Sequence, residues 1–407
     1  MSDQDLPEPK ARGTPAEVFW AFLKLGLTAF GGPVAHLGYF REAFVRRRKW
    51  LDEAAYADLV ALCQFLPGPA SSQVGFGLGL RRAGALGALA AWVGFTLPSA
   101  VLMILFAYGV GFMTGTWALA VIHGLKLVAV AVVAQAVWGM ARTLTPDARR
   151  IAIGALAFGL VTFIPGAVGQ VGAIVLGGLA GLAVCRQGLE APQRVHHPAM
   201  VSKRVGLFAL AVFFVLLLGT PILATATHDP AIARFDAFYR AGALVFGGGH
   251  VILPLLKQGF VDTGWVGPDT FLAGYGAAQA LPGPLSTFAA FLGAALRGQP
   301  NGLFGAGLGV VGIFLPGMLT LVAALPFWSA LQKRPNMRAA MRGANASVVG
   351  VLAAALYSPV WTSSVHDLSD VAIAGCGFVL LAAVRAPPIL VVALGAVTGA
   401  LRVVLAI

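Results

Sequence analysis

The 407-residue chain is 58% hydrophobic and only 11% charged, whereas soluble domains carry about 25% charged residues. Its mean hydropathy is +0.84. This composition excludes a soluble protein and predicts an integral membrane protein, and the long, Gly-rich apolar stretches indicate transmembrane helices rather than a β-barrel. The formal charge is +12, but the charges cluster between apolar stretches, which indicates membrane orientation and anion handling rather than nucleic-acid binding.

Neither a signal peptide, a metal site nor a cofactor is expected. Residues 1–17 are polar and lack a basic start followed by an apolar core. Cys63, Cys185 and Cys376 stand isolated in apolar sequence, so they are interpreted as small buried hydrophobes. No dinucleotide fingerprint, flavin motif or phosphate-binding loop is present.

Apolar segments are predicted in one order in two parts of the chain. The first set is 18–40, 54–80, 83–113, 118–141, 150–164 and 169–185, and the second is 234–256, 268–296, 302–329, 338–357, 371–384 and 387–406. We therefore divide the chain into a polar tail (1–17), an N-terminal repeat (18–185), a basic linker with one extra transmembrane helix (186–233) and a C-terminal repeat (234–407). The single extra helix would insert two like halves in opposite orientations.

Three short phrases occur in both halves. The phrase Gln64 to Pro69 returns as Gln279 to Pro284, and Pro282 follows Pro67 by 215 residues (282 − 67). Phe30-Gly31-Gly32-Pro33 returns as Phe246-Gly247-Gly248-Gly249, and Gly94-Phe95-Thr96-Leu97-Pro98 returns as Gly312-Ile313-Phe314-Leu315-Pro316. Three phrases in one order at nearly one offset indicate an internal duplication.

Loop charges predict that the two halves are inverted. Loops 41–49 and 142–150 are basic in the first half, and in the second half loop 330–342 is basic while 257–269 and 358–370 are not. Because basic loops stay in the cytoplasm, corresponding loops are predicted on opposite sides of the membrane. The fold class is therefore an all-α integral membrane protein built as an inverted-topology repeat.

Basic residues on both sides of segment 54–80 predict a re-entrant hairpin broken at Pro67-Gly68-Pro69. The Gly31-Gly32 segment is predicted to form a second hairpin of the same kind. Pro removes a backbone donor and Gly permits a chain reversal, so neither Leu-Pro-Gly-Pro phrase fits a continuous helix.

Each break is predicted to hold the substrate. Ser71 and Ser72, or Ser286 and Thr287, would occupy the first turn of the following helix, where free N–H groups and a positive partial charge attract anions. Gly and Pro could instead only permit kinks or close packing. The repetition of the doublet with hydroxyls at matched positions favours the functional interpretation.

Cations within apolar sequence are further candidates. Lys24 and Arg240 are matched by the repeat and either face a pathway or extend to the membrane interface. Lys126 lies in the middle of a segment, with Asn345 at its matched position.

Amide and imidazole groups complete the candidates. Gln64 and Gln279 directly precede the breaks and would either line the site or cap freed carbonyls. His36 and His250 follow the glycine doublets and would serve a proton-coupled step or only pack. The predicted substrate-binding set is Lys24, Gly31, Gly32, Gln64, Pro67, Gly68, Pro69, Ser71, Ser72, Lys126, Arg240, Gly247, Gly248, Gln279, Pro282, Gly283, Pro284, Ser286, Thr287 and Asn345.

These paired motifs resemble those of the chromate ion transporter family, over nearly the whole chain from about Pro15 to Ile407. The resemblance implies a multi-pass protein of the bacterial inner membrane that exports chromate, an oxyanion similar to sulfate in shape and charge. Short members of the family carry one half per chain and work as pairs, whereas this chain contains both. The expected partners are a chromate- or sulfate-type oxyanion and the lipid bilayer, with no nucleic acid, and a homodimer is left open.

Three classes of function compete. The first is a secondary oxyanion transporter that works by alternating access and is coupled to an ion or proton gradient. The second is a passive anion channel, since paired helix termini could also line a pore. The third is an intramembrane serine enzyme using Ser71 or Ser286, which is disfavoured because no Gly-x-Ser setting with a His partner is present.

Overall fold

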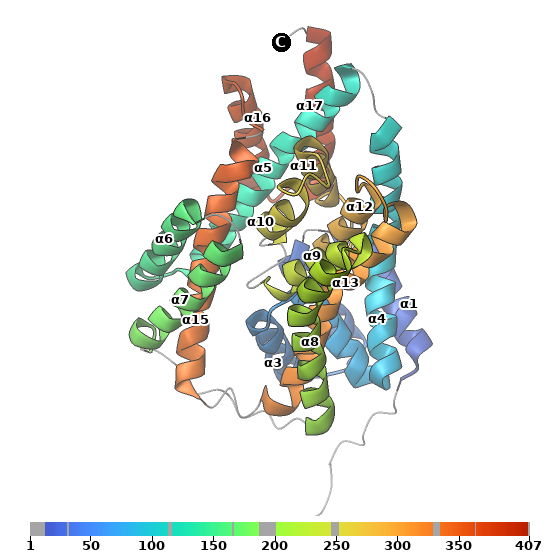
Figure 1. Ribbon diagram of the computed structural model, residues 1–407, viewed down its shortest axis with the longest axis vertical. Helices are drawn as coiled ribbons and strands as arrows, with labels where there is room; N and C mark the ends of the chain where they lie inside the picture. The colour runs from blue at the N-terminus through green and yellow to red at the C-terminus, as the bar shows by residue number, and fades with distance from the viewer. Residues whose placement is uncertain are drawn as a thin grey trace, which may run out of the picture.

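The computed structural model describes residues 13–30, 32–112, 116–164, 167–186, 201–245, 252–328, 334–362 and 364–405. These residues form helices without a β-strand (Figure 1), which confirms the predicted all-α architecture. Five described helical stretches are long and apolar enough to cross a membrane: Ala70–Gly109, Leu119–Leu144, Lys203–Thr227, Gly302–Phe327 and Pro335–Ser358.

The helices of the two halves follow the same order. The first half contains α1 (Pro15–Thr28), α2 (Gly32–Phe40), η1 (Arg41–Arg47), α3 (Glu53–Phe65), α4 (Ala70–Phe112), α5 (Thr116–Leu144), α6 (Ala148–Phe163) and α7 (Ala167–Val184). After α8 (Lys203–Thr227), the second half contains α9 (Pro230–Ala243), α10 (Ile252–Leu256), η3 (Lys257–Val261), α11 (Pro268–Ala278), η4 (Leu285–Thr287), α12 (Phe288–Ala294), α13 (Gly302–Ala324), η5 (Leu325–Phe327), α15 (Pro335–Ala355), η6 (Leu356–Trp361), α16 (Leu368–Val379), η7 (Leu380–Val384) and α17 (Pro388–Leu405).

The chain folds back on itself after the first break. Helix α4 has two parts, because Ala83 and Gly84 inside it have non-helical backbone angles that reverse the chain. A Cβ on Gly79 would lie 2.3 Å from the carbonyl oxygen of Gly87, so the two parts of α4 lie side by side. The Arg82 guanidinium lies 5.4 Å from the centre of the Trp50 ring. The hairpin of α3 and the first part of α4 therefore begins and ends at one place.

The α1–α2 hairpin has its open end at the same place. Phe22 of α1 stacks on Phe44 of η1 with ring centroids 4.7 Å apart, and Glu17 forms an ion pair with Arg82 at 3.1 Å. The second half repeats this closure, because the Arg297 N–H bonds the Trp265 carbonyl at 2.9 Å. The hairpin of α11 and α12 is thus closed at its base in the same way as the hairpin of α3 and the first part of α4.

The helices pack as two bundles. The core bundle contains α1–α4 and α8–α13, and the scaffold bundle contains α5, α6, α7, α15, α16 and α17. Within the scaffold bundle, α6 and α7 pack on α15 of the other half, while α16 and α17 pack on α5. In Figure 1, α5 begins at the upper end and α15 at the lower end, so these two repeat-related helices run in opposite directions.

Within the predicted apolar segment 18–40, α1 ends at Thr28 and α2 begins at Gly32, whose φ is +77°, so the segment is interrupted where the glycine doublet predicts an interruption. One expectation about the cysteines needs correction. Cys63 and Cys185 are buried as expected, but Cys376 is exposed on α16. Its neighbours in sequence are apolar because the outer face of that helix is apolar, so apolar sequence alone did not indicate burial.

Candidate functional site

The hairpin tips of the two halves contact each other through reciprocal hydrogen bonds. Gly68 in the first break donates its N–H to the carbonyl of Val245 at 2.7 Å. Gly283 in the second break donates its N–H to the carbonyl of Ala29 at 3.0 Å. Ala29 and Val245 occupy matched positions just before the two Phe-Gly-Gly phrases. Each break therefore receives a backbone acceptor from the opposite half.

The third repeated phrase completes this contact. Gly68 has a φ of +127°, and a Cβ there would lie 2.6 Å from the Cα of Gly317, directly after the second Leu-Pro. Gly283 has a φ of +93°, and its Cβ would lie 2.8 Å from the Oγ of Ser99, directly after the first Leu-Pro. Only glycine combines this backbone conformation with so close an approach. The Pro-Gly-Pro breaks therefore meet the residues that follow each Leu-Pro, together with Ala29 and Val245, where the two halves touch.

Around the first break, buried polar side chains gather without enough partners. His36 is 1% exposed, and its Nδ1 lies 3.5 Å from the Oγ of Ser71, while its ring meets Phe95 edge-on. The His36 Nε2, the Ser72 Oγ and the Thr96 Oγ1 are buried without a hydrogen-bond partner. A buried polar atom left unpaired costs about 1–3 kcal/mol. Such a group of free donors is expected where a polar ligand binds.

A side-chain clamp holds the first break in shape. The Gln73 Nε2 donates to the carbonyls of Gly317 at 2.8 Å and Pro67 at 3.0 Å. The Thr320 Oγ1 donates to the same Pro67 carbonyl at 3.0 Å. The carbonyl freed by the break is thus bonded by a glutamine from its own half and a threonine from the other. Helix α4 begins directly afterwards at Ala70, so the N–H groups of its first turn are directed to the tip.

The backbone and hydroxyl contacts around the second break differ from those around the first. Its chain continues as a 3-10 turn, Leu285–Thr287, before the short helix α12. The Thr287 Oγ1 bonds the Pro284 carbonyl at 2.8 Å, so this hydroxyl is already used. Ser286 and Pro282 are buried here as well. The matched hydroxyls predicted to act as a pair therefore lie in unlike environments.

The predicted cations do not gather at the breaks. Lys24 lies on the exposed face of α1. Lys126 is 7% exposed and pairs at 2.7 Å with Asp269, at the start of α11. Arg240 forms an ion pair with Asp236 on the same helix. The last two are engaged by carboxylates that the sequence interpretation had not considered.

The remaining candidates differ in placement. Gln64 is exposed on α3, whereas the Nε2 of its counterpart Gln279 is buried without a partner. Asn345 is half-buried on α15, and Pro69 is buried beside the first break. Gly31, Gly247, Gly248 and His250 lie outside the described residues.

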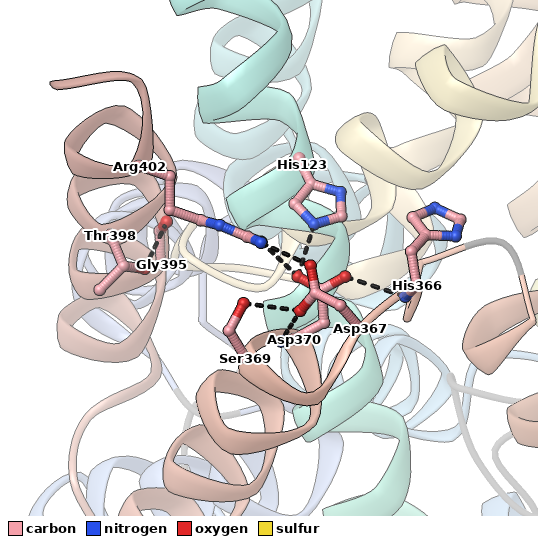
Figure 2. A network of polar contacts seen from close by, with 8 residues as sticks. All are labelled: His123, His366, Asp367, Ser369, Asp370, Gly395, Thr398 and Arg402. Carbon is pink, nitrogen blue, oxygen red and sulfur yellow. Dashed lines mark hydrogen bonds and ion pairs between the residues drawn. The ribbon is translucent and has the colours of Figure 1, made fainter. Parts of the chain in front are cut away.

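A second polar cluster joins α5 to α16 and α17 (Figure 2), and sequence reasoning missed it. The Asp370 carboxylate accepts hydrogen bonds from the Nε2 of His123 at 2.7 Å, the backbone N–H of His366 at 2.9 Å and the guanidinium of Arg402. Asp370 is 0% exposed, and its acceptors are filled by these donors. The cluster therefore ties the two halves together and is saturated without a ligand.

Residues that act at the tips but were not predicted include Gln73, Thr96 and Thr320. Gln73 and Thr96 stand in or directly beside the repeated phrases, so the duplication held a signal for them. Thr320 follows the third phrase by four residues, about one helical turn from Pro316.

The family described as "Chromate transporter" matches residues 16–182 and 232–400 of the chain. A probable chromate transport protein of Synechococcus elongatus is 29% identical over 85% of this chain and 84% of its own length. A chromate transport protein of Pseudomonas aeruginosa is 29% identical over 83% of this chain and 79% of its own, and one of Cupriavidus metallidurans is 27% identical over 82% and 80%. No solved structure matches the chain.

Proposed function

Because this chain belongs to the chromate transporter family, we propose that it is a secondary transporter that exports chromate, or a related oxyanion such as sulfate, across the bacterial inner membrane. The matched relatives named as chromate transport proteins support chromate as the substrate. The observation that carries the proposal is the meeting of the hairpin tips, with the free buried donors of His36, Ser72 and Thr96 beside the first break.

The first break supplies the anion site. A tetrahedral dianion that leaves water needs several hydrogen-bond donors at once, since burying a charge without partners is costly. The first-turn N–H groups of α4 carry a positive partial charge of about half a unit. The hydroxyls of Ser71 and Ser72 and the Nε2 of His36 add donors from the side. Oxygen atoms of the substrate would accept from all of them.

His36 is the proposed proton carrier. A dianion next to a neutral imidazole favours uptake of a proton by the ring, since opposite charges stabilise each other in a medium of low dielectric constant. His36 is the titratable side chain that the described residues place in contact with Ser71. Coupling through His250 stays a proposal on sequence alone.

Among the described residues, the two bundles contact each other through one of two repeat-related pairs of helices and not through the other, which supports alternating access. Helix α11 of the second half, in the core bundle, packs against α5 of the first half, in the scaffold bundle. The Lys126–Asp269 ion pair lies in this interface. The repeat-related helices are α3 and α15, and no packing of this kind joins them within the described part of the chain. We infer that the opposite state exchanges these roles, so that α3 closes on α15 while α11 leaves α5.

The inverted arrangement of the halves and the re-entrant path of their hairpins belong to the same proposal. The opposite directions of α5 and α15 and the reciprocal bonds of Gly68 and Gly283 support them. In an inverted repeat, exchanging the states of the two halves moves the access path from one membrane face to the other.

Flux into proteoliposomes tests the function. Labelled chromate and sulfate are offered to vesicles containing the purified protein, with and without a pH gradient and with unlabelled anion inside. We expect saturable uptake that the pH gradient changes and that the trapped anion accelerates. Flux that neither saturates nor responds to trapped anion would identify a channel instead. An absence of flux for both anions would refute the proposed substrate class.

A further inference from the structure

A buried carboxylate holds the arginine of α9 in place. Asp236 is 2% exposed and accepts a hydrogen bond from the Oγ1 of Thr220, on α8, at 2.7 Å. Its other oxygen, Oδ2, forms the ion pair with Arg240, one helical turn further along. The Arg240 side chain is 50% exposed. Guanidinium has five N–H donors, so a single carboxylate leaves part of this cation available.

The exposed part of Arg240 belongs to the wall of a cavity of about 650 Å³ between α8, α9 and η3. This volume is far larger than the share of about 30 Å³ that one water molecule takes in the liquid, so an oxyanion can enter together with water. The polar side chains of Thr225, His228 and Gln258 also line it. Asp236 is the single carboxylate among the described residues that line the cavity.

The wall of the cavity ends next to a residue that contacts the hairpin tips. Leu244 forms part of its wall. The next residue, Val245, provides the carbonyl that accepts the Gly68 N–H at 2.7 Å. One layer of side chain and backbone therefore separates the cavity from the first break. Leu244 and Val245 therefore link the wall of the cavity to the first break.

The extra helix creates this environment in one half only. Lys24 and Trp20 are the positions that match Arg240 and Asp236 through the repeat. Both side chains are exposed, and Trp20 is 66% exposed. Within the described ranges no counterpart of α8 lies beside α1, so no residue equivalent to Thr220 orders a carboxylate there. The two positions are exposed on the surface in the first half, whereas Asp236 and Arg240 line a cavity in the second half.

We propose that this cavity is a second oxyanion site, in which a tetrahedral dianion such as sulfate or chromate competes with Asp236 for Arg240. The proposal rests on the proposed transport function and adds to it a second binding site, separate from the one at the first break. With the cavity empty, Asp236 occupies the guanidinium and keeps it ordered. The bound oxyanion takes the free edge of Arg240 and weakens its contact with Asp236, while Thr220 continues to bond the carboxylate. Asp236 thereby sets the affinity of the site.

Chemical protection on the unmodified protein is the first test. The purified full-length chain in lipid-free detergent is treated with phenylglyoxal, which modifies accessible arginines, and the modified peptides are quantified by mass spectrometry. We expect sulfate to slow the modification of Arg240 by about threefold or more relative to chloride at equal ionic strength. Modification of Arg334, which is exposed at the start of α15, should not change. Equal modification of Arg240 in both salts would overturn the proposal.

Binding of labelled sulfate to variants is the second test. In a titration that resolves this site from the central one, Arg240→Gln should weaken binding at this site by about tenfold, since one charge-assisted contact is lost. Asp236→Asn should strengthen binding several-fold, because the amide keeps the shape and the Thr220 contact but releases the guanidinium. The control Arg334→Gln should stay within about twofold, because water and salt screen an exposed charge. Unchanged binding in Asp236→Asn would refute the competition even if Arg240→Gln failed to fold.

Two further arms separate the alternatives. Phosphatidylglycerol is added to the detergent sample in place of sulfate; if only the lipid protects Arg240, the cavity is a headgroup site and the proposal is wrong. Sulfate protection of Arg240 in a protein that shows no chromate or sulfate flux would disprove the transport function and leave this site standing. Flux with Arg240 unprotected would refute this site alone.

Discussion

The two halves of the molecule share one backbone plan and differ in the chemistry of their tips. The first half places His36, Ser72 and Thr96 around its break. At the matched positions the second half has Ile252, the self-bonded Thr287 and Phe314, all buried. Three unpaired buried polar groups thus lie at the first tip, whereas the matched positions of the second have two apolar side chains and a hydroxyl bonded to its own chain. The two halves therefore share the geometry of the break but differ in the side chains around it, and this difference is what makes the first break the proposed anion site.

The largest effect is expected at the break glycines, and it should be unequal. Gly68→Ala should abolish transport, because its Cβ would meet the backbone of Gly317 at 2.6 Å. Gly283→Ala should retain part of the activity, since its closest neighbour is the movable Oγ of Ser99. Flux in proteoliposomes at matched protein content measures both.

Gly264→Ala is the matched control for the backbone conformation. Gly264 has a φ of +75°, but a Cβ added there would meet no atom within 4 Å, so the change adds strain without crowding. We expect it to leave most of the flux. Equal losses in all three variants would mean that backbone strain, and not the approach of the two halves, decides the effect.

The hydroxyl pairs come next. Replacing Ser71 and Ser72 by Ala should weaken oxyanion binding by about tenfold, as expected for the loss of one or two net hydrogen bonds. Replacing Ser286 by Ala and Thr287 by Val should change it by less than about threefold, because the Thr287 hydroxyl bonds Pro284. Binding of labelled sulfate to purified protein measures both. A larger loss from the second pair would place the site in the other half.

The ion pair of Lys126 and Asp269 should respond unequally to the removal of each partner. Asp269→Asn leaves the buried Lys126 uncompensated, so we expect a loss of up to about 3 kcal/mol in the free energy of unfolding. Lys126→Met leaves only Asp269, whose side chain is 71% exposed, and should cost little. Thermal unfolding in detergent compares them. A greater loss in Lys126→Met would contradict the burial of this cation.

The smallest effect concerns the aspartates that cap α16 and α6. Hydrogen bonds from Ser369, the Asp370 N–H and Arg402 lower the pKa of Asp367 well below its usual range, and bonds from Arg150 lower the pKa of Asp147. A lowered folded pKa stabilises the protein above the unfolded pKa of about 3.9, and this contribution is lost as the pH falls further. We expect Asp367→Asn to lower the Tm at pH 7 slightly more than Asp147→Asn. Both differences from the parent should shrink below about pH 4, and differences that persist there would exclude the carboxylate charge as their cause.

Much of the scaffold could be predicted from the sequence, because its signals are local or repeated. The Pro-Gly-Pro breaks and the glycine doublets interrupt helices through their own backbone chemistry, and Gly68 and Gly283 have the positive φ that such a break requires. The duplication also indicated that the two breaks belong together. The partner of each break could not be predicted, because Val245 and Ala29 accept the hydrogen bonds through their backbone carbonyls and their side chains give no indication of it.

The cations show where sequence reasoning reached its limit. Arg240 and Lys126 lie in apolar helices, and a helical period does not tell which neighbour a given face will meet. Asp236 and Asp269 are reached only after α8 and α11 are packed in place. Lys24 shows a second limit. The repeat matches it to Arg240, but α8 packs against α9 and no corresponding helix packs against α1 in the described ranges, so Lys24 is exposed.

The reciprocal bonds of Gly68 and Gly283 have a consequence for the history of such chains. The N–H of each break glycine is bonded by the other half, so the two halves are needed in equal numbers. Two separate genes would need matched expression to achieve this, whereas one fused chain fixes the stoichiometry at one to one. Fusion also removes the demand that each tip fit a copy of itself. A substitution at one of two matched positions, such as Thr96 and Phe314, then alters only one side of the contact, and the two halves are free to specialise.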